Sequence, residues 1–371
     1  MKFRVEREAL ADAVAWTARN LPSRPPVAVL AGVLLEVDGH QLSVSGFDYE
    51  VSTQVEIDVE AATAGRALVS GRLLAEITRA LPAHPVQIAV SGSRAELTCG
   101  SSRFTLPVMP VEDYPSLPAM PTTAGALESD VFESAVRQVA VAAGRDDTLP
   151  VLTGVRFEIA GERITMAATD RYRLAVRELT WRPSTPDLTA NALVPARTLT
   201  ETAKSMASGA EVTLALATGG TGEGMIGFSG AGRRATTRLL DGEFPKYRSL
   251  LPAEHSAVAM VPTATLVDAV KRVALVAERN TPVRLRFSAG ELVLEAGGAD
   301  EAQASESLEA GFDGEELTIA FNPTFLLDGL NAIDSDTTRL AFTAATKPAV
   351  MTGKEGGTDY RYLLMPVRLS G

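Results

Sequence analysis

Basic side chains recur at equivalent places along this 371-residue chain. The first set lies 10 or 11 residues after matching alanines and consists of Arg24, Arg145 and Arg279. The second set is two pairs whose members lie 125 residues apart, Arg72 with Arg197 and Arg79 with Lys204. Cations at like positions of like helices predict contact with a continuous polyanion, because guanidinium and ammonium groups bind phosphates. The alternative, that exposed helices carry cations anyway, stays open because acidic residues nearly balance them.

These cations follow an internal repeat. One short segment occurs three times, as LADAV at 10–14, FESAV at 132–136 and LVDAV at 266–270. Segment 29–37 matches 151–159 at an offset of 122 residues, and 68–74 matches 193–199 at an offset of 125. The third counterpart is 319–326, and it lacks the second set of cations, since Thr324 and Asn331 stand there. A unit of roughly 125 residues therefore occurs three times.

Each unit has the same predicted elements. Apolar residues at helical spacing predict a first helix, and alternating segments such as 41–45 and 163–167 predict strands. A second helix is expected around 71–80, 196–207 and 323–333, with Pro195 and Pro323 in its first turn. We therefore expect an α+β fold of three tandem domains, each an antiparallel sheet with two helices on one face.

Proline-rich stretches at 107–121 and 245–262 mark the predicted boundaries. The expected domains are 1–122, 123–252 and 253–371. Two helices per domain give six per chain and twelve in a pair of chains. Twelve helices packed ~9 Å apart form a circle of ~35 Å diameter, which leaves a hole of ~25 Å, wide enough for a DNA duplex. A single chain would leave too little room.

The net charge of −11 argues against a nucleic-acid binder, but its distribution is uneven. The three predicted domains carry −4, 0 and −7, and no Lys or Arg occurs between Arg286 and Arg339. Basic residues elsewhere can still form a local patch. No run approaches the ~18 apolar residues of a membrane span, and the first residues do not read as a targeting peptide. Cys99 is the single cysteine, which fits a reducing cytoplasm and excludes an internal disulfide.

Signals for catalysis or cofactor binding are weak. Segment 222–227 matches GxGxxG, but glycine-rich sequence on both sides predicts a hairpin and not a nucleotide site. The three histidines have no ligand spacing, and Cys99 has no neighbouring His and is expected in a strand. Asp146 and Asp147 are expected to be solvated, and Trp16 is expected in the core. We expect no catalytic site, metal or cofactor.

Five landmarks in order give the chain a family resemblance. They are MKFRVERE at 1–8, Arg24-Pro followed by VLAG at 29–32, TDRYRL at 169–174, DGEFPKY at 241–247 and YLLMPVRL at 362–369. With these landmarks the chain resembles the bacterial DNA polymerase III beta subunits, the replicative sliding clamps. Its overall sequence is most similar to actinobacterial members.

The resemblance implies a head-to-tail homodimeric ring of six domains, with helices lining the hole and sheets outside. Such a ring slides on double-stranded DNA, so its contacts must go to phosphates and not to bases. By position, Arg24, Arg72, Arg79, Arg145 and Arg197 match DNA-facing residues of the family. The implied partners are the replicative polymerase, an ATP-driven clamp loader, translesion polymerases and repair proteins. The implied location is the cytoplasm, at the nucleoid.

The family also has a peptide-binding cleft between its second and third domains, which binds short linear motifs and is an antibiotic target for peptide inhibitors. The matching positions are Leu152, Thr169, Tyr172, Arg173, Leu174, Pro245, Leu250, Asn322, Phe325, Thr346, Pro348, Leu363, Met365, Pro366, Val367 and Arg368. Leu, Pro and Met would form apolar subsites, and Arg173 and Arg368 polar rim contacts.

The resemblance has departures. Many relatives have Gly-His where this chain has Arg171 and Tyr172, and many end before Ser370 and Gly371. Both changes lie at the implied cleft and predict a different shape or partner access there.

The implied ring interface places Phe104 and Leu106 of one chain against Leu275 and Val276 of the other. The alternative is that these four are ordinary core residues.

Three other functions stay open at this point. One is a specialised second clamp, tuned to tolerate a cleft-binding inhibitor. Another is a protein-only scaffold built from the three repeats, which leaves the recurring arginines unexplained. The last is a metal-dependent nuclease, which would need clustered carboxylates or histidines that the sequence lacks.

Overall fold

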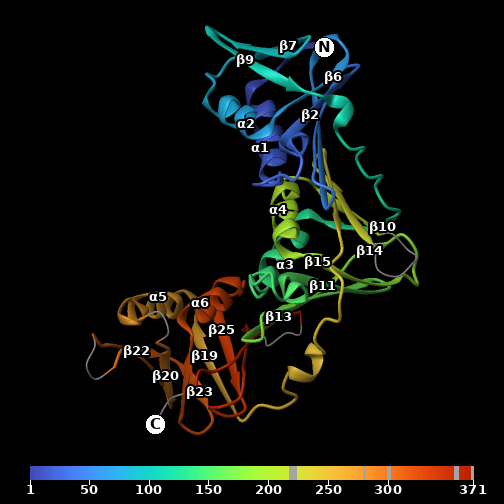
Figure 1. Cartoon of the computed structure of the whole chain (residues 1–371). Helices are drawn as coiled ribbons and strands as arrows, with labels where there is room; N and C mark the ends of the chain where they lie inside the picture. The colour runs from blue at the N-terminus through green and yellow to red at the C-terminus, as the bar shows by residue number, and fades with distance from the viewer. Residues whose placement is uncertain (217–223, 279–280, 299–301, 355–358, 369–371) are drawn as a thin grey trace. The chain divides into compact units, whose positions relative to one another are not determined.

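A strand that leads directly into a helix opens each repeat. The computed structural model describes residues 1–216, 224–278, 281–298, 302–354 and 359–368 (Figure 1). The opening pairs are β1 (Lys2–Val5) with α1 (Arg7–Arg19), β10 (Thr123–Glu128) with α3 (Ser129–Ala140), and β19 (Ala257–Pro262) with α5 (Thr263–Val273). The second helices are α2 (Gly71–Ala80), α4 (Ala196–Met206) and α6 (Pro323–Ala332). All six helices lie where the repeat predicts them.

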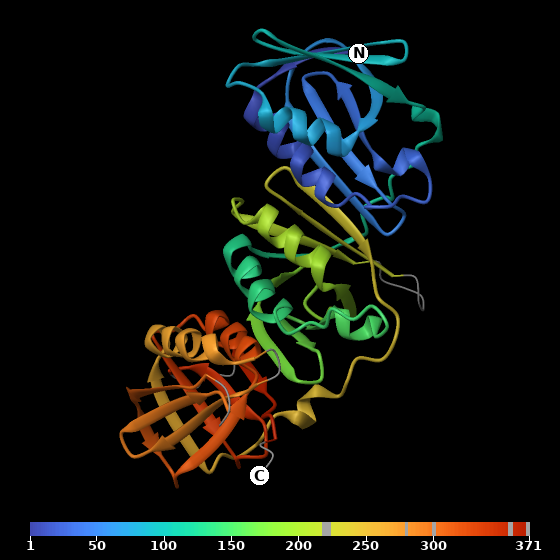
Figure 2. The same cartoon turned by 60° about the vertical axis from the view of Figure 1, so that its left-hand side comes forward.

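Hydrophobic spacing explains how these helices pack. In α1 the buried residues Leu10, Ala13, Val14 and Thr17 recur every three or four positions and form one face. That face packs against α2 and against strands of the first repeat, and α5 likewise packs against α6. Figure 2 shows each of these helix pairs side by side across its sheet. Trp16 is buried within the same layer, as predicted.

One helix boundary differs from the prediction. Pro323 occupies the first turn of α6, where its missing N–H costs no hydrogen bond. Pro195, by contrast, is the last residue of a strand, and α4 begins only at Ala196. The prediction that Pro195 lies in the first turn of the helix was therefore wrong, because strand β15 extends through Pro195 and the helix follows directly.

The chain divides into two compact units. The first contains Met1–Glu133, Arg182–Pro186 and Thr198–Leu239, and the second contains the remaining residues. The division passes through the middle repeat, so each unit holds parts of two repeats.

A 14-stranded sheet runs through the first unit, in the order β14-β10-β16-β17-β18-β4-β3-β2-β6-β9-β8-β7-β1-β5. Its remaining strands from the first repeat are β2 (Gly32–Asp38), β3 (Gln41–Phe47), β4 (Val51–Asp58), β5 (Glu60–Thr63), β6 (Gly65–Ser70), β7 (Val86–Ser91), β8 (Arg94–Cys99) and β9 (Ser102–Met109). Those from the middle repeat are β14 (Arg182–Pro183), β16 (Glu211–Leu216), β17 (Met225–Gly230) and β18 (Arg233–Arg238). The antiparallel pairing of β18 with β4 joins the two repeats.

The second unit has two sheets. The larger has the order β15-β11-β12-β13-β27-β26-β25-β19-β23, and the smaller β22-β21-β20-β24. Strands from the middle repeat are β11 (Gly154–Ala160), β12 (Arg163–Thr169), β13 (Arg173–Thr180) and β15 (Thr189–Pro195). Those from the third repeat are β20 (Val283–Ser288), β21 (Glu291–Ala296), β22 (Ala304–Glu309), β23 (Gly311–Asp313), β24 (Leu317–Phe321), β25 (Thr337–Phe342), β26 (Ala349–Gly353) and β27 (Tyr360–Leu364). The pairing of β13 with β27 joins these repeats.

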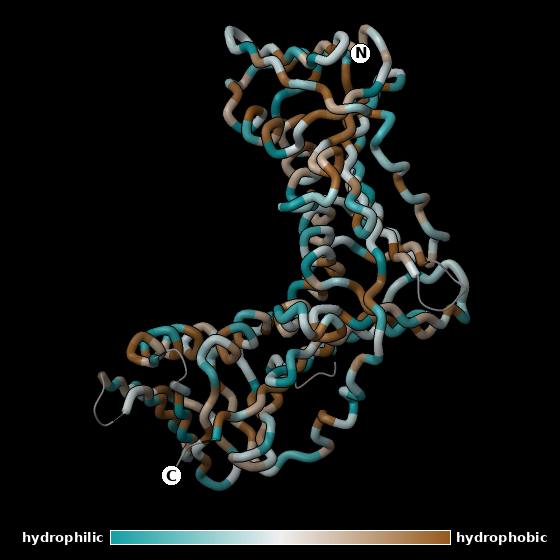
Figure 3. Tube along the Cα trace, in the orientation of Figure 1, coloured by the Kyte–Doolittle hydropathy of each residue, from teal (hydrophilic) through white to brown (hydrophobic). Residues whose placement is uncertain are grey.

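The alternation of buried and exposed residues along the strands produces the core. Figure 3 shows the hydrophobic residues concentrated on strands and helices, with the connecting loops mostly hydrophilic. Cys99 is buried at the end of β8, as expected for a strand residue. Of the glycine-rich segment 222–227, Gly222 and Glu223 are outside the described residues, and 225–227 lie in β17, which pairs antiparallel with β16.

Two features were not found among the residues that the structure describes, a membrane-spanning helix and a metal-binding cluster. No helix among the described residues is long and apolar enough to cross a membrane. The same residues contain no group of His, Cys, Asp and Glu arranged to hold a metal ion.

We expect that Gly329→Ala destabilises the protein by about 1–2 kcal/mol, because overpacking a core costs ~1–3 kcal/mol and the gain in helix propensity offsets part of it. A Cβ at Gly329 on α6 would lie 2.5 Å from Cδ1 of the fully buried Tyr362. Denaturant unfolding would measure the change. In the matched control Gly311→Ala, the new Cβ meets Met260 at 3.7 Å, an ordinary contact. Equal stability of the two variants would contradict the packing described here.

Candidate functional site

A tight turn between β12 and β13 forms one wall of the implied cleft. The Asp170 carboxylate accepts hydrogen bonds from the backbone N–H groups of Tyr172 (3.0 Å) and Arg173 (3.1 Å). The Thr169 hydroxyl donates to the Arg173 carbonyl at 2.6 Å and accepts from the Arg171 N–H at 3.2 Å. Arg171 sits at the tip with a φ of 80°. The turn thus holds the Tyr172 side chain 56% exposed while that of Arg173 points into the protein.

Arg173 is the centre of a buried ionic cluster. Its guanidinium pairs with Asp170 at 3.0 Å and with Asp328 of α6. It also lies 3.5 Å from the hydroxyl of Tyr362 on β27. Burial alone would lower the pKa of Arg173, but its interactions with Tyr362, Asp328 and Asp170 outweigh burial and raise it. Arg173 therefore remains a cation that ties the middle repeat to the third.

This burial corrects one expectation. Arg173 was expected at the polar rim of the cleft, but it is only 5% exposed. Its donors are used within the protein, because a buried guanidinium needs its charge neutralised locally. Arg368, the other expected rim residue, is exposed.

Aromatic rings adjoin this cluster. The Phe325 ring of α6 lies 4.4 Å from the Arg173 guanidinium, within the range of a cation–π contact. The ring of Tyr172 stacks on Phe325 with their centroids 6.0 Å apart. The Tyr362 hydroxyl donates to the Phe325 carbonyl at 2.8 Å, and burial raises the pKa of Tyr362, although Arg173 opposes the shift. The two repeats therefore meet through stacked rings above a buried cation.

The last described segment continues this wall. The N–H of Met365 donates to the Tyr172 carbonyl at 2.9 Å, and the N–H of Val367 donates to the Ala320 carbonyl at 2.8 Å. These bonds leave the side chains of Met365 and Val367 exposed. Asn322 caps α6 by accepting from the N–H groups of its first turn, and this fixes the helix end that carries Phe325.

The remaining implied cleft residues differ in exposure. Leu174 and Leu363 are buried in a cluster with Tyr247, so they support the site from below. Leu250 and Thr346 are exposed. The half-buried members are Leu152, Pro245, Pro348 and Pro366. Hydrogen bonds and ring contacts therefore join Thr169, Tyr172, Arg173, Phe325 and Met365 directly, while the others lie on adjoining segments. Ser370 and Gly371 are outside the described residues.

Sequence reasoning missed the acidic and phenolic partners of Arg173. Asp170 carried a usable signal, because Asp is favoured in turns where its carboxylate binds the following N–H groups. Asp328 and Tyr362 lie 155 and 189 residues from Arg173 along the chain, and no local pattern marks them.

The recurring cations are available to a ligand. Arg72 and Arg79 are exposed on α2, and Arg197 and Lys204 are exposed on α4. Arg24 and Arg145 are exposed in the loops that follow α1 and α3. None of these six pairs with a carboxylate among the described residues, whereas Arg19 pairs with Glu201 and Arg272 with Glu306. Arg279 is outside the described residues.

The four implied interface residues fall into two groups. Leu275 is 84% exposed on the turn η5 (Ala274–Val276), Phe104 is exposed on β9, and Val276 is half-buried. Leu106 is only 2% exposed, so its expected place in an interface was wrong. Phe104 lies two residues earlier on the same face of β9 and is 38% exposed, so burial changes along that face of the strand.

Comparisons with known proteins agree over the whole chain. The family models for the N-terminal, central and C-terminal domains of the DNA polymerase III beta subunit match residues 1–118, 126–246 and 248–368. The beta sliding clamp of Streptomyces coelicolor is 61% identical, with 100% of both chains covered. The beta sliding clamp homolog GriR of Streptomyces muensis is 46% identical, with 99% of both covered.

A solved structure gives the same picture. The sliding clamp of Pseudomonas aeruginosa bound to griselimycin superimposes with a TM-score of 0.90 at 28% identity, and 100% of both chains is covered.

We expect that Asp328→Ala destabilises the protein by about 2 kcal/mol, because it removes a hydrogen-bonded partner from a buried charge. Denaturant unfolding would measure the loss. Asp334→Ala removes an exposed carboxylate of the same repeat and is the control, with an expected change within about 0.5 kcal/mol. A loss no larger than that of the control would mean that Asp170 alone suffices for Arg173.

Proposed function

The chain belongs to the DNA polymerase III beta subunit family, and on that premise we propose that it works as a sliding clamp that encircles duplex DNA and makes a replicative polymerase processive. The observation that carries this proposal is the ordered match of all three family domains along the chain. We place the domains at 1–122, 123–252 and 253–371. The higher identity to an ordinary clamp than to GriR favours this function over that of a specialised second clamp.

The DNA-facing residues of the proposed ring are Arg24, Arg72, Arg79, Arg145, Arg197, Lys204 and Arg279. Their support is the exposure and lack of described acidic partners of the first six. Contacts from long cationic side chains to phosphates carry no sequence information, which is what a sliding protein requires. The net charge of −11 then limits adhesion to DNA, so that retention comes from enclosure and not from affinity.

Two copies form the proposed ring by pairing the first repeat of one with the third repeat of the other. Two strand edges support this arrangement. Within the described residues, β9 pairs with β6 only at Val108 and Met109, and β22 is the terminal strand of its sheet. Exposed Arg103 on β9 and Glu309 on β22 have opposite charges, and exposed Leu275 supplies apolar area.

The proposed peptide site is the surface around Tyr172, Phe325, Leu250, Met365 and Val367. Its occupants are short motifs of the replicative polymerase, the clamp loader, translesion polymerases and repair proteins, as well as peptide inhibitors such as griselimycin. Exposed apolar and aromatic side chains beside a polar rim suit extended peptides. In this proposal the chain has no catalytic site of its own and acts in the cytoplasm at the nucleoid. An external ATP-driven loader places it on DNA.

The ring predicts topological retention on DNA. Light scattering should give a dimer of the 39.1 kDa chain. After loading onto nicked plasmid by a clamp loader, the protein should remain on circles at high salt and run off linearised plasmid at least ~10 times faster. Electrostatic contacts alone would weaken equally on both forms as salt rises.

A monomer, or loss at equal rates from circles and linear molecules, would contradict the ring. Nuclease or ATPase turnover by the homogeneous protein would contradict the absence of catalysis.

Two exposed apolar residues should show opposite defects. Met365→Glu should weaken griselimycin binding roughly tenfold or more, because a charge is desolvated in the cleft, while the dimer persists. Leu275→Glu should yield monomers and leave griselimycin binding within about twofold. Calorimetry and light scattering would measure both variants, and each serves as the control for the other. If both variants lost both properties, the two surfaces would not be separate.

A further inference from the structure

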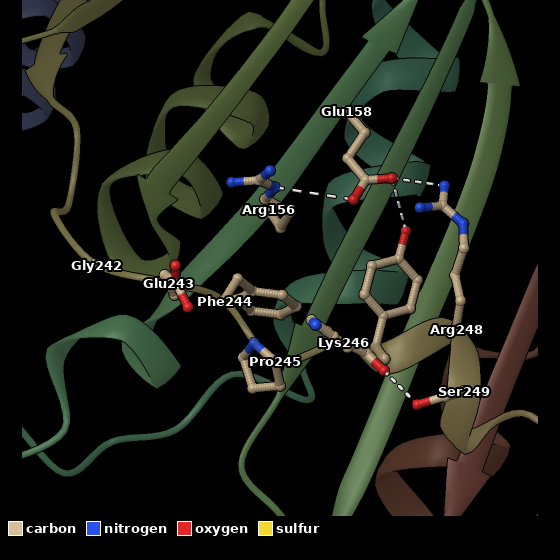
Figure 4. A pocket seen from close by; sticks show the side chains of 10 residues that line it. Arg156, Glu158, Gly242, Glu243, Phe244, Pro245, Lys246, Arg248 and Ser249 are labelled. Atoms are coloured by element: carbon tan, nitrogen blue, oxygen red, sulfur yellow. Dashed lines mark hydrogen bonds and ion pairs between the residues drawn. The ribbon is translucent and has the colours of Figure 1, made fainter. Parts of the chain in front are cut away.

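A pocket of about 600 Å³ lies beside the turn η4 (Tyr247–Leu250) in the second unit. Its walls come from β11 and from the segment 242–249. Pockets that hold small ligands or side chains are typically ~300–1,000 Å³, so this one is large enough to bind a group. Figure 4 shows Arg156, Glu158 and Arg248 directed toward one another along one wall, with Glu243 apart from them.

Cations outnumber carboxylates in this pocket, three to two. Glu158 accepts a hydrogen bond from the Tyr247 hydroxyl at 3.0 Å, pairs with Arg248, and lies 3.9 Å from Nε of Arg156. The exposed Lys246 ammonium forms no ion pair with a carboxylate among the described residues. On a chain of net charge −11, a locally cationic pocket differs from the average surface and attracts anions.

The cations keep donors that Glu158 does not use. A guanidinium has five N–H donors, and the side chain of Arg248 is 65% exposed. The hydrogen bond to Glu158 raises the pKa of Arg248, so its charge persists. Phe244 and Tyr247 meet edge to face at 6.0 Å and form an apolar wall. An entering carboxylate therefore meets charged donors, and its methylene groups meet aromatic rings.

The pocket adjoins the proposed peptide cleft. Pro245 lines the pocket and also belongs to the cleft, and Leu250 of the cleft lies at the other end of η4. Tyr247 packs in the same buried cluster as Leu174 and Leu363 beneath the cleft. Pro245 is thus common to the pocket and the proposed cleft, so a peptide whose end lies at Pro245 has its next residues beside the pocket.

We propose that this pocket is a second docking subsite, which binds an acidic side chain flanking the apolar motif of a partner segment held in the cleft. The inference rests on the proposed cleft. A partner peptide is the occupant because the pocket continues the cleft. The charge balance selects an acidic flank over a basic one, and Lys246 supplies the cation that is not neutralised by Glu158.

A charge swap tests the subsite in the full-length protein. The probes are a fluorescent peptide with the cleft motif of a partner polymerase, and the same peptide extended at either end by Asp-Asp, Asn-Asn or Lys-Lys. At low salt, an Asp-Asp extension at one end should bind about fivefold tighter than Asn-Asn, and the gain should shrink as salt rises. Lys246→Glu should reverse the preference toward Lys-Lys and leave the unextended peptide unchanged.

Lys2→Glu is the matched control, since Lys2 is an exposed lysine of β1 in the first unit and the charge change is identical. It should keep the wild-type preference. The inference is overturned if Lys246→Glu also keeps that preference, or if Asp-Asp never exceeds Asn-Asn, while the unextended peptide binds normally. If the unextended peptide does not bind the wild-type chain at all, the cleft proposal fails and the subsite fails with it.

Discussion

Backbone pairing between repeats is the constraint on which the candidate site depends. β13 of the middle repeat and β27 of the third are antiparallel neighbours in register from Arg173 with Leu364 to Arg177 with Tyr360. Because side chains alternate between the two faces of a strand, a slip of one residue in this register would turn every side chain to the opposite face. The pairing therefore sets where the Tyr172 turn meets Met365 and where Arg173 meets Tyr362. In the first unit, the pairing of β18 with β4 joins repeats in the same way.

The arginines of the chain differ in whether they have an acidic partner. Arg173 is buried and pairs with acids of two repeats, and Arg19 and Arg272 each pair with one glutamate at the surface. The six recurring cations have no carboxylate partner among the described residues. Exposed ion pairs contribute little to stability, so folding does not require these cations to be paired. Their positions follow the repeat and not the local needs of packing. This separation is what a protein needs if it must hold its own shape and still present positive charge to a polyanion.

Much of the fold could be predicted from the sequence, and the site only in part. Helix positions followed from the repeat offsets and apolar spacing, because both depend on nearby residues. The exposure of individual side chains could not be predicted from the sequence, since it depends on neighbours in other strands and domains. Leu106 and Phe104 are apolar residues on the same face of one strand, yet only Phe104 is exposed. Arg173 reads as a surface cation until Asp328 is placed beside it. The pocket at 242–249 could not be predicted from the sequence, because Glu158 lies on a strand more than eighty residues earlier.

The turn at Arg171 has an implication for how such a site can change. A side chain in the left-handed region costs roughly 1 kcal/mol or more, and glycine would avoid that cost. Here the hydrogen bonds of Thr169 and Asp170 go to backbone groups of the turn and do not use the Arg171 side chain. The tip is therefore free to vary while the frame stays fixed. A substitution at Arg171 or Tyr172 can therefore reshape the surface of the proposed peptide site while the turn beneath it keeps its hydrogen bonds.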